Sequence, residues 1–305
     1  MSDPASVLEK LLAAFHRRRP LRAGSLIVTA FGDMIAPRGG AVLLADLAPL
    51  LARLGINDSQ ARTALSRLVA DRWLESRRLG RRSLYRLTRT GAHRFTEATR
   101  RIYFGAPQPW DERWTVALLA PVAEKRRANL RRDLQWLGFG ALAAETLIHP
   151  NPDRQSLRSV IDDLQADARP LLLHGQDFGA PAPASLRKLA RQCWQLDGLE
   201  RAYSQFARHF APLERALAAG GALDPGQCAL ARILLIHDYR RIILRDPLLP
   251  PALMAADWPG TKAHGLARDI YRRVAAGGEL WIDAHLHDAR GALPPPDAAF
   301  HRRFA

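Results

Sequence analysis

The basic residues between Asp71 and Arg101 are the group whose types and spacing point most clearly to chemistry. This stretch holds ten arginines and three carboxylates. Its surplus of positive charge is nearly half of the formal charge of +15 on the 305-residue chain, which has 45 lysines and arginines and 30 acids. Clustered guanidinium groups favour a polyanionic partner, whereas an evenly spread excess could reflect composition alone. Within the stretch, "SRRLGRRSLYRLT" surrounds a Leu-Gly pair with four arginines: Arg77, Arg78, Arg81 and Arg82.

The helix expected just before this stretch carries polar groups on one side. Its apolar residues recur at helical spacing and predict a buried face of Ala61, Ala64, Leu65, Leu68 and Val69. The other side would expose hydroxyl and guanidinium groups, which a recognition helix presents to base edges and phosphates in a DNA major groove. Each feature alone fits a solvated surface, but their adjacency favours DNA. The predicted DNA contacts are Ser59, Gln60, Arg62, Thr63, Ser66, Arg67, Arg77, Arg78, Arg81 and Arg82.

The elements that would position these residues follow one another from residue 21 to residue 104. We expect an apolar helix around 24–34, a Pro-Arg-Gly-Gly turn, a short strand at 41–43 and a helix from about 45 to 54. A third helix would begin at an N-cap of Asn57 or Asp58, followed by strands 73–78 and 82–88 around Leu79-Gly80. This order is that of a winged helix-turn-helix, with the arginine-rich hairpin as its wing.

The rest of the chain completes an α+β protein. Residues 1–20 predict an amphipathic helix over 5–17 that ends at "HRRRP", a candidate lid or dimer contact. After the linker "FGAPQPW", residues 110–180 predict a ferredoxin-like α/β domain: a buried strand in "RWTVALLAPV", a basic helix from 124, "ALAAETLIHPNP" as a strand into a loop, a helix at about 153–167 and the apolar "PLLLHG". The linker "GAPAPAS" leads to a helical domain, 185–290, with helices at 186–219, 225–245 and 262–276.

Three further groups could carry chemistry. "EKRRANLRRD" is a solvated helix face or a second phosphate contact. "IDAHLHDAR" places His285 and His287 on one side of an extended chain, where they are exposed or bind a divalent metal. We predict no metal centre. His237, Arg241 and Arg245 follow one another at i, i+4 steps, with Arg240 on a neighbouring face. This column is either ion-paired with Asp238 and Asp246 or, beside the Trp-bearing proline segment, binds the phosphates of an acyl-coenzyme A. The predicted effector residues are His237, Arg240, Arg241, Arg245 and Trp258.

Other sequence features bound the class of protein. Cys193 and Cys228 lie far apart within apolar helical patterns, which is typical of buried thiols rather than of a disulfide framework. No secretory signal or membrane span is evident, so we expect a soluble cytoplasmic protein. Nucleophile-elbow, P-loop and dinucleotide-binding signatures are absent. We therefore expect neither a cofactor nor an enzyme.

Four segments resemble successive hallmarks of the PaaX-type repressors of bacterial phenylacetic acid catabolism. They are "SLIVTAFGDMIAPRGG", "GINDSQARTALSRLVADRWLESRRLGRRSLYRLTRTG", "RIYFGAPQPWDERW" and "HDYRRIILRDPLLPPALMAADWPG", and the resemblance covers roughly residues 21–276. It implies a winged helix, a central domain similar to a small CRISPR-associated endonuclease, and a helical C-terminal domain. It also implies a homodimer on a palindromic operator that phenylacetyl-CoA releases, although the sequence does not specify the acyl group.

The strand "WTVALLAPV" departs from that endonuclease pattern. The nucleases carry a metal-binding aspartate at the end of this strand, and here Ala120-Pro121 stands in its place. We therefore interpret the central domain as a scaffold or dimerisation unit. The sequence predicts a DNA-binding transcriptional repressor of an aromatic-acid catabolic operon. The competing interpretations are a metal-dependent nuclease, a thioesterase-like enzyme acting on an acyl-CoA, and a non-specific architectural DNA-binding protein.

Overall fold

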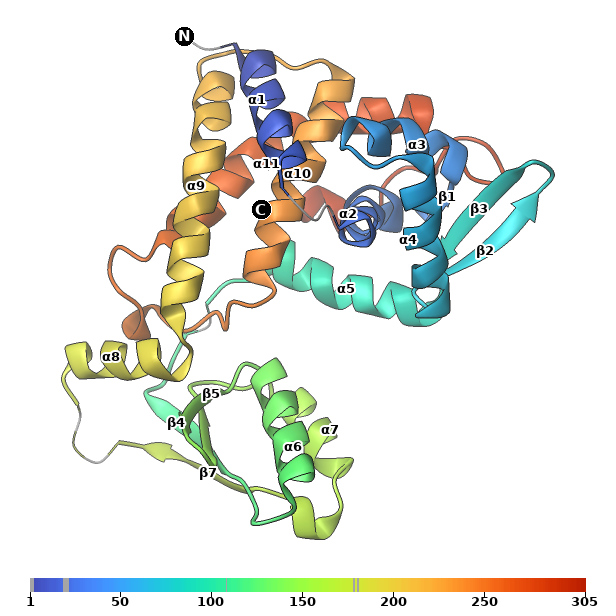
Figure 1. The fold of residues 1–305 in the computed structure, drawn as a ribbon. Coiled ribbons are helices and arrows are strands. Elements are labelled where there is room, and N and C mark those ends of the chain that lie inside the picture. Colours follow the sequence, from blue (N-terminus) through green and yellow to red (C-terminus); the bar gives the residue numbers. More distant parts are fainter. Residues whose placement is uncertain (1–2, 19–21, 108, 178, 180) are drawn as a thin grey trace. The chain divides into compact units, whose positions relative to one another are not determined.

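The chain is a mixed α and β protein, and its described residues form two small antiparallel sheets (Figure 1). The computed structural model describes residues 3–18, 22–107, 109–177, 179 and 181–305. Parts of "HRRRP" and of both expected linkers lie outside these residues. The chain divides into two compact units, one made of Met1–Gly105, Ser204–Leu244 and Thr261–Ala305, the other of Ala106–Tyr203 and Arg245–Gly260. The domains expected from the sequence differ from this division, because residues 185–290 contribute to both units.

The N-terminal part of the first unit follows the expected order of elements closely. Helix α1 spans Pro4–His16 and α2 spans Ala23–Ala30, and α2 continues through a π-helical turn, η1 (Phe31–Ile35), and a 3-10 turn, η2 (Ala36–Arg38). Strand β1 (Ala41–Leu43), α3 (Leu44–Arg53), α4 (Asp58–Ala70), β2 (Leu74–Leu79) and β3 (Arg82–Leu87) come next. Helix α5, Arg89–Phe104, was not foreseen.

The first sheet joins β1 to the arginine-rich hairpin in the strand order β1-β3-β2. Val42 of β1 is opposite Tyr85, and Arg77 of β2 is opposite Leu84. The two-residue turn is Gly80-Arg81 rather than the expected Leu79-Gly80, since Leu79 still pairs with Arg82. Gly80 has a φ of +58°, which glycine tolerates without steric cost and which suits the first central position of a tight hairpin turn.

Helix α4 is held by its apolar side. Ala61, Ala64 and Leu65 are buried, and Leu68 and Val69 are half-buried, so the expected apolar face is confirmed. This face packs on α2 and beside β2, and Figure 1 shows α4 between α2 and the hairpin. The opposite face of α4 is therefore directed away from the core.

The helical C-terminal region contributes its first helix to the second unit, and the helices that follow complete the core of the first unit. The expected helix 186–219 is two helices, α8 (Pro183–Cys193) and α9 (Leu196–Ala218), while α10 spans Pro225–Ile243 and α11 is longer than expected, Pro259–His285. Most of α10 is buried, because α1, α2 and α5 pack around it. The chain ends in the 3-10 turn η5, Phe300–Arg302.

The second unit contains a four-stranded sheet. Its elements are β4 (Arg113–Leu118), α6 (Glu124–Trp136), β5 (Gly140–Ala143), β6 (Thr146–His149), α7 (Arg154–Asp162), the 3-10 turn η3 (Ala166–Ala168), β7 (Leu171–Gln176), α8 and the 3-10 turn η4 (Pro251–Leu253). All strand pairs are antiparallel, in the order β5-β6-β4-β7. This element order is that of a ferredoxin-like βαββαβ unit.

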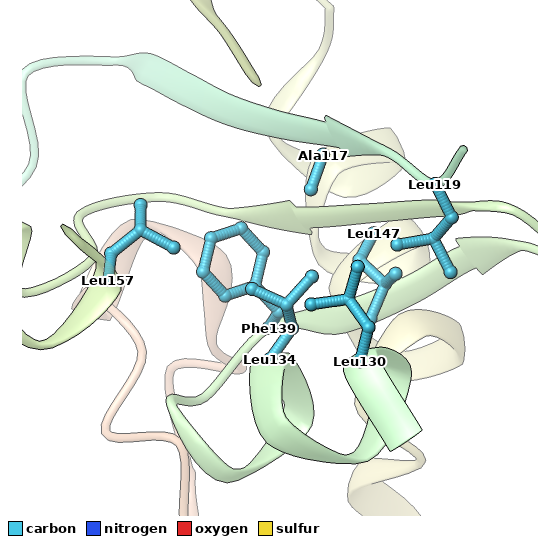
Figure 2. Packing of buried hydrophobic residues seen from close by; sticks show 7 residues of the cluster. All are labelled: Ala117, Leu119, Leu130, Leu134, Phe139, Leu147 and Leu157. Atoms are coloured by element: carbon cyan, nitrogen blue, oxygen red, sulfur yellow. The ribbon is translucent and has the colours of Figure 1, made fainter. Parts of the chain in front are cut away.

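One expectation for this sheet was wrong, because "ALAAETLIHP" forms the β5–β6 hairpin and not a single strand. The helices cover one face of the sheet. Figure 2 shows side chains of α6 directed toward the buried residues of the strands, and the cluster comprises Ala117, Leu119, Leu130, Leu134, Phe139, Leu147 and Leu157.

Candidate nucleic-acid interface

Helix α4 begins with a capping box. The Asn57 side chain accepts a hydrogen bond of 2.9 Å from the backbone N–H of Gln60, and the Gln60 side-chain oxygen accepts one of 3.0 Å from the backbone N–H of Asn57. These reciprocal bonds satisfy two N–H groups at the helix start, so the sequence identifies Asn57 correctly as one of its two N-cap candidates. They also give Gln60, a predicted DNA contact, a structural role that occupies its oxygen.

The side of α4 opposite the core exposes the remaining predicted residues of this helix. The only one of them with a carboxylate near it, among the residues described, is Arg62, whose Nη2 lies 3.9 Å from Asp58. The Arg62 side chain is 72% exposed, and such a long, solvated pair adds little stability and leaves the guanidinium free to move. The residues exposed on this side are Ser59, Arg62, Thr63, Ser66 and Arg67.

The hairpin exposes all four of its predicted arginines. Arg78 donates from Nε to the carbonyl of Gly80 at 3.1 Å, which supports the turn. Within the described part of the chain, Arg77, Arg81 and Arg82 form no salt bridge. Arg77 and Arg78 are neighbours on a strand, so their side chains leave opposite faces of the ribbon. The hairpin therefore presents positive charge on both faces and at its tip.

These two features together can contact a duplex. The guanidinium group stays protonated at any physiological pH and matches phosphate oxygens with its paired donors. A positive ribbon beside a helix that exposes hydroxyl and guanidinium groups supplies phosphate contacts and base contacts from adjacent elements. All ten predicted residues are exposed. Two of them, Gln60 and Arg78, also form hydrogen bonds that support the start of α4 and the hairpin turn.

The expected column of His237, Arg241 and Arg245 is not one helix surface, because His237 is buried and α10 ends at Ile243, before Arg245. His237 is buried with its Nδ1 3.0 Å from Thr29 Oγ1, and burial lowers its pKa to about 3, so it is neutral. Arg240 donates to the Thr29 hydroxyl at 2.8 Å and to the Ser25 carbonyl at 2.7 Å, and burial lowers its pKa to about 10. Both residues join α10 to α2.

The other three predicted effector residues lie elsewhere. Arg241 and Arg245 are exposed, but α10 ends at Ile243, so they do not continue one helical column. Arg245 and Trp258 belong to the second unit, where the half-buried Trp258 ring lies 6.1 Å from the ring of Tyr203. The sequence pattern missed this separation because it shows spacing along a helix and not where the helix ends.

A buried charged cluster in the first unit was also missed. Asp33, in η1, accepts hydrogen bonds from Arg232 Nε at 2.5 Å, from the Tyr103 hydroxyl at 2.6 Å, and from Arg303 and the Tyr271 hydroxyl at 3.1 Å each. Arg232 and Asp33 side chains are completely buried. No local pattern could have indicated this cluster, because Asp33 and Arg232 are 199 residues apart and Asp33 and Arg303 are 270 apart.

The cluster continues toward the surface through Glu279. This carboxylate of α11 accepts from Arg232 at 2.5 Å and from Arg38 of η2, also at 2.5 Å. Arg38 in turn contacts Asp283 at 2.7 Å. The chain of ion pairs connects the π-helical turn after α2 with α10, α11 and the C-terminal residues, so the C-terminal helices hold the N-terminal elements in place.

Comparisons with known proteins agree with this architecture. Models of the PaaX-like protein, the PaaX protein central Cas2-like domain and the PaaX-like protein C-terminal domain match residues 22–91, 107–187 and 194–284. The transcriptional repressor PaaX of Escherichia coli (strain K12) is 34% identical over 286 residues, which are 93% of this chain and 90% of that protein. This chain belongs to the PaaX family. The resemblance noted from its motifs is thereby confirmed.

A solved structure is also similar. The uncharacterized protein Rv0674 from Mycobacterium tuberculosis matches this PaaX-family chain with a TM-score of 0.50 and 25% sequence identity. The match covers 77% of the present chain and 91% of the mycobacterial one. The fold is therefore shared with a solved protein whose sequence is only 25% identical to this chain.

The Cas2-like unit of this PaaX-family member holds no recognisable metal centre in its described residues. Strand β4 ends at Leu118 and is followed by Ala120-Pro121, with no carboxylate at the position that the family resemblance singles out. Throughout the described part of the chain, no three histidines, cysteines or carboxylates are grouped so that they could hold a metal ion. None of the described helices has the length and apolar character needed to cross a membrane.

The candidate histidines and cysteines have other surroundings. His285 is the last residue of α11, stacks on Trp281 at 4.8 Å and lies 2.8 Å from the Trp281 carbonyl, so the expected extended arrangement with His287 was wrong. His287 instead bonds Asp46 of α3 at 2.9 Å. Cys193 and Cys228 are buried free thiols, as expected, and burial raises the pKa of both.

Proposed function

We propose that this member of the PaaX family is a DNA-binding transcriptional repressor without catalytic activity. Its residues 23–87 would act as a winged helix-turn-helix, with α4 as the recognition helix and β2–β3 as the wing. The observation that carries the proposal is the exposed polar side of α4 next to a hairpin whose arginines Arg77, Arg81 and Arg82 form no salt bridge within the described residues. The relative named as a transcriptional repressor, at 34% identity, supports it.

The two elements would divide the work of recognition. On α4, Arg62 and Arg67 suit the bidentate contact with guanine, and Ser59, Thr63 and Ser66 can donate to or accept from base edges or phosphates. The hairpin arginines would neutralise backbone phosphates or enter the adjacent minor groove, which adds affinity with little sequence preference. Gln60 would contribute chiefly by fixing the start of α4.

We further propose that an aryl-coenzyme A thioester such as phenylacetyl-CoA releases a homodimeric form of the repressor from its operator. Release requires that the thioester bind the DNA-incompetent arrangement more tightly, because only differential affinity shifts such an equilibrium. Arg241 of the first unit and Arg245 of the second are both exposed, and each by itself is a candidate for contact with a phosphate of the ligand. His237 and Arg240 are less suited, because both hold α10 to α2. The genes of phenylacetate catabolism are the regulated set that the family resemblance suggests.

A mobility-shift experiment tests the function. The promoter nearest the gene is titrated with the protein at physiological salt, with and without phenylacetyl-CoA, against a random duplex of equal length. We expect a shift specific for the promoter that the thioester abolishes and that free coenzyme A does not. Equal binding to both duplexes would identify a non-specific DNA-binding protein instead. Cleavage of plasmid in the presence of Mg²⁺ or Mn²⁺ would contradict the non-enzymatic assignment.

A further inference from the structure

A turn after α11 lies beside the base of the hairpin. The carbonyl of His287 accepts a hydrogen bond of 2.9 Å from the backbone N–H of Leu43 in β1. The Asp46 side chain of α3 accepts bonds from the backbone and the ring of His287, at 3.0 and 2.9 Å. We call residues 287–292 the C-terminal turn. Figure 1 shows this red part of the chain passing next to β1.

The C-terminal turn is closed by its own hydrogen bonds. His287 and Ala292 form an antiparallel bridge, and the N–H of Asp288 donates to the Gly291 carbonyl at 2.8 Å. Gly291 adopts a φ of +130°, which only glycine enters readily. The turn is therefore a fixed structure on the first unit, attached to both β1 and α3, and the position of Arg290 relative to the hairpin is defined.

A cavity of about 630 Å³ separates the C-terminal turn from the hairpin. Arg77, Arg86 and Arg290 all line it. Arg77 lies opposite Leu84 and Arg86 lies opposite Glu75, so the register places both arginines on the same face of the ribbon. Arg290 approaches this face from the turn. The lining residues are Gly39, Ala41, Glu75, Ser76, Arg77, Leu84, Arg86, Asp288, Ala289 and Arg290.

The two carboxylates in this lining are already engaged. Glu75 bonds Arg86 Nε at 2.6 Å, and Asp288 accepts from the backbone N–H of Arg290 at 2.6 Å. The Asp288 side chain also lies 3.3 Å from Arg290 Nη2, and the Arg290 side chain is 82% exposed, so its guanidinium group can still donate to a phosphate while this pair persists. Within the described residues Arg77 has no salt bridge. Two guanidinium groups, Arg77 and Arg290, are thus available across the cavity.

We propose that this cavity seats a backbone phosphate of the bound duplex, held between Arg77 of the hairpin and Arg290 of the C-terminal turn. The inference rests on the proposed DNA-binding function and extends its contact surface beyond the winged helix. Guanidinium groups approaching from two directions can share one phosphate, and the neutralised phosphate would release about one counterion when the duplex binds. The contact is to the backbone, so it adds affinity without sequence preference.

The test compares Arg290→Ala with Arg290→Lys and with Arg273→Ala. Arg273 is a matched control because it is an exposed arginine of α11 that forms no salt bridge within the described residues. For Arg290→Ala we expect about fivefold weaker binding to promoter and random duplex alike. The plot of log K against log salt should be flatter by at most about one, because Arg77 still contacts the shared phosphate. Arg290→Lys keeps the charge and should restore the slope. Arg273→Ala should bind as the parent protein does.

The combined variant Arg77→Ala, Arg290→Ala addresses whether the two residues share a phosphate. If they do, its loss of affinity is smaller than the product of the two single losses. Thermal unfolding of each variant verifies that the fold is intact.

Two outcomes would overturn the inference. In the first, Arg290→Ala binds DNA like Arg273→Ala, while Arg81→Ala, Arg82→Ala still weakens binding. In the second, inorganic phosphate stabilises the parent protein but not Arg290→Ala, and DNA binding is equal in both, which would mark a site for a free anion. Failure of the proposed function looks different, because the parent protein itself would then bind no DNA.

Discussion

Two groups of arginines in the same compact unit have opposite surroundings. Arg232 and Arg303 are buried around Asp33, with hydrogen bonds to carboxylate, hydroxyl and carbonyl groups. Arg81 and Arg82, at the tip of the hairpin, are exposed and form no salt bridge in the part of the chain described. One residue type therefore serves the fold in one place and is left available for a partner in the other.

The difference follows from the cost of removing a guanidinium from water. A buried ion without partners costs several kcal/mol, so a buried arginine needs a carboxylate and further acceptors around it. Burial raises the pKa of Asp33, but the positive charges of Arg232 and Arg303 and the bond from Tyr103 outweigh it, so the pKa of Asp33 lies below its ordinary value. An exposed arginine keeps its water until a phosphate replaces it. The net charge of the chain therefore does not show which arginines are ion-paired in the core and which are exposed to a partner.

Asp33→Asn should have the largest effect, because it leaves Arg232 and Arg303 buried without their shared negative charge. We expect the free energy of unfolding to fall by about 3–5 kcal/mol, as for other broken buried ion pairs, measured by urea denaturation. The control is Asp283→Asn, at the exposed end of the same chain of ion pairs, which should cost less than about 1 kcal/mol. Equal effects of the two substitutions would remove the distinction between buried and exposed pairs.

The buried His237 should make the stability of the protein depend on pH. Its pKa is lowered to about 3 in the folded state, mainly by burial, and would be about 6.5 in the unfolded chain. Its contribution to stability is therefore complete above pH 6.5 and is lost as the pH falls toward 3, at about 1.4 kcal/mol per pH unit. Between pH 7 and pH 5 the parent protein should lose about 2 kcal/mol more than His237→Asn, whose amide can still bond Thr29. If the urea midpoints of the two proteins change equally between pH 7 and pH 5, His237 is not the group whose protonation lowers stability.

Arg81→Ala, Arg82→Ala tests the exposed group. We expect unchanged thermal unfolding, binding to promoter and random duplexes weaker by about tenfold or more, and a salt slope lower by about two, because two phosphate contacts are lost. The matched control is Arg273→Ala, Arg302→Ala, which removes the same charge from exposed arginines elsewhere in the unit. If the control weakens binding equally, net charge and not the hairpin governs affinity.

The smallest effects are expected for Gln60 and Arg62 of α4, which should differ in whether they affect stability or base preference. Gln60→Ala removes one half of the capping box and should lower the free energy of unfolding by about 1 kcal/mol, with base preference unchanged. Arg62→Ala should leave stability within about 0.5 kcal/mol and relax the preference at one base pair of the operator. Binding to a set of single-base operator variants, together with urea denaturation, checks both. A change of base preference in Gln60→Ala would show that Gln60 contacts bases of the operator.

Local signals in the sequence were sufficient where neighbouring residues decide the structure. Strand β1 was predicted with its exact ends, Asn57 was one of two N-cap candidates, and the apolar face of α4 was assigned correctly. Capping bonds join residues three apart, and helical and strand periodicity appear within a few turns. The hairpin turn was displaced by one residue because either neighbour of Gly80 could complete it.

By itself, the sequence determined that a polar-faced helix precedes an arginine-rich hairpin and that this chain carries the motifs of the PaaX family. Only the tertiary structure decided which charges are occupied. It buried His237 and Arg240 against α2, gathered Asp33, Arg232 and Arg303 from distant segments, and brought Arg290 to the hairpin. The physical reason is that periodicity indicates that a side chain is buried but not what it is buried against, and these contacts join segments up to 270 residues apart.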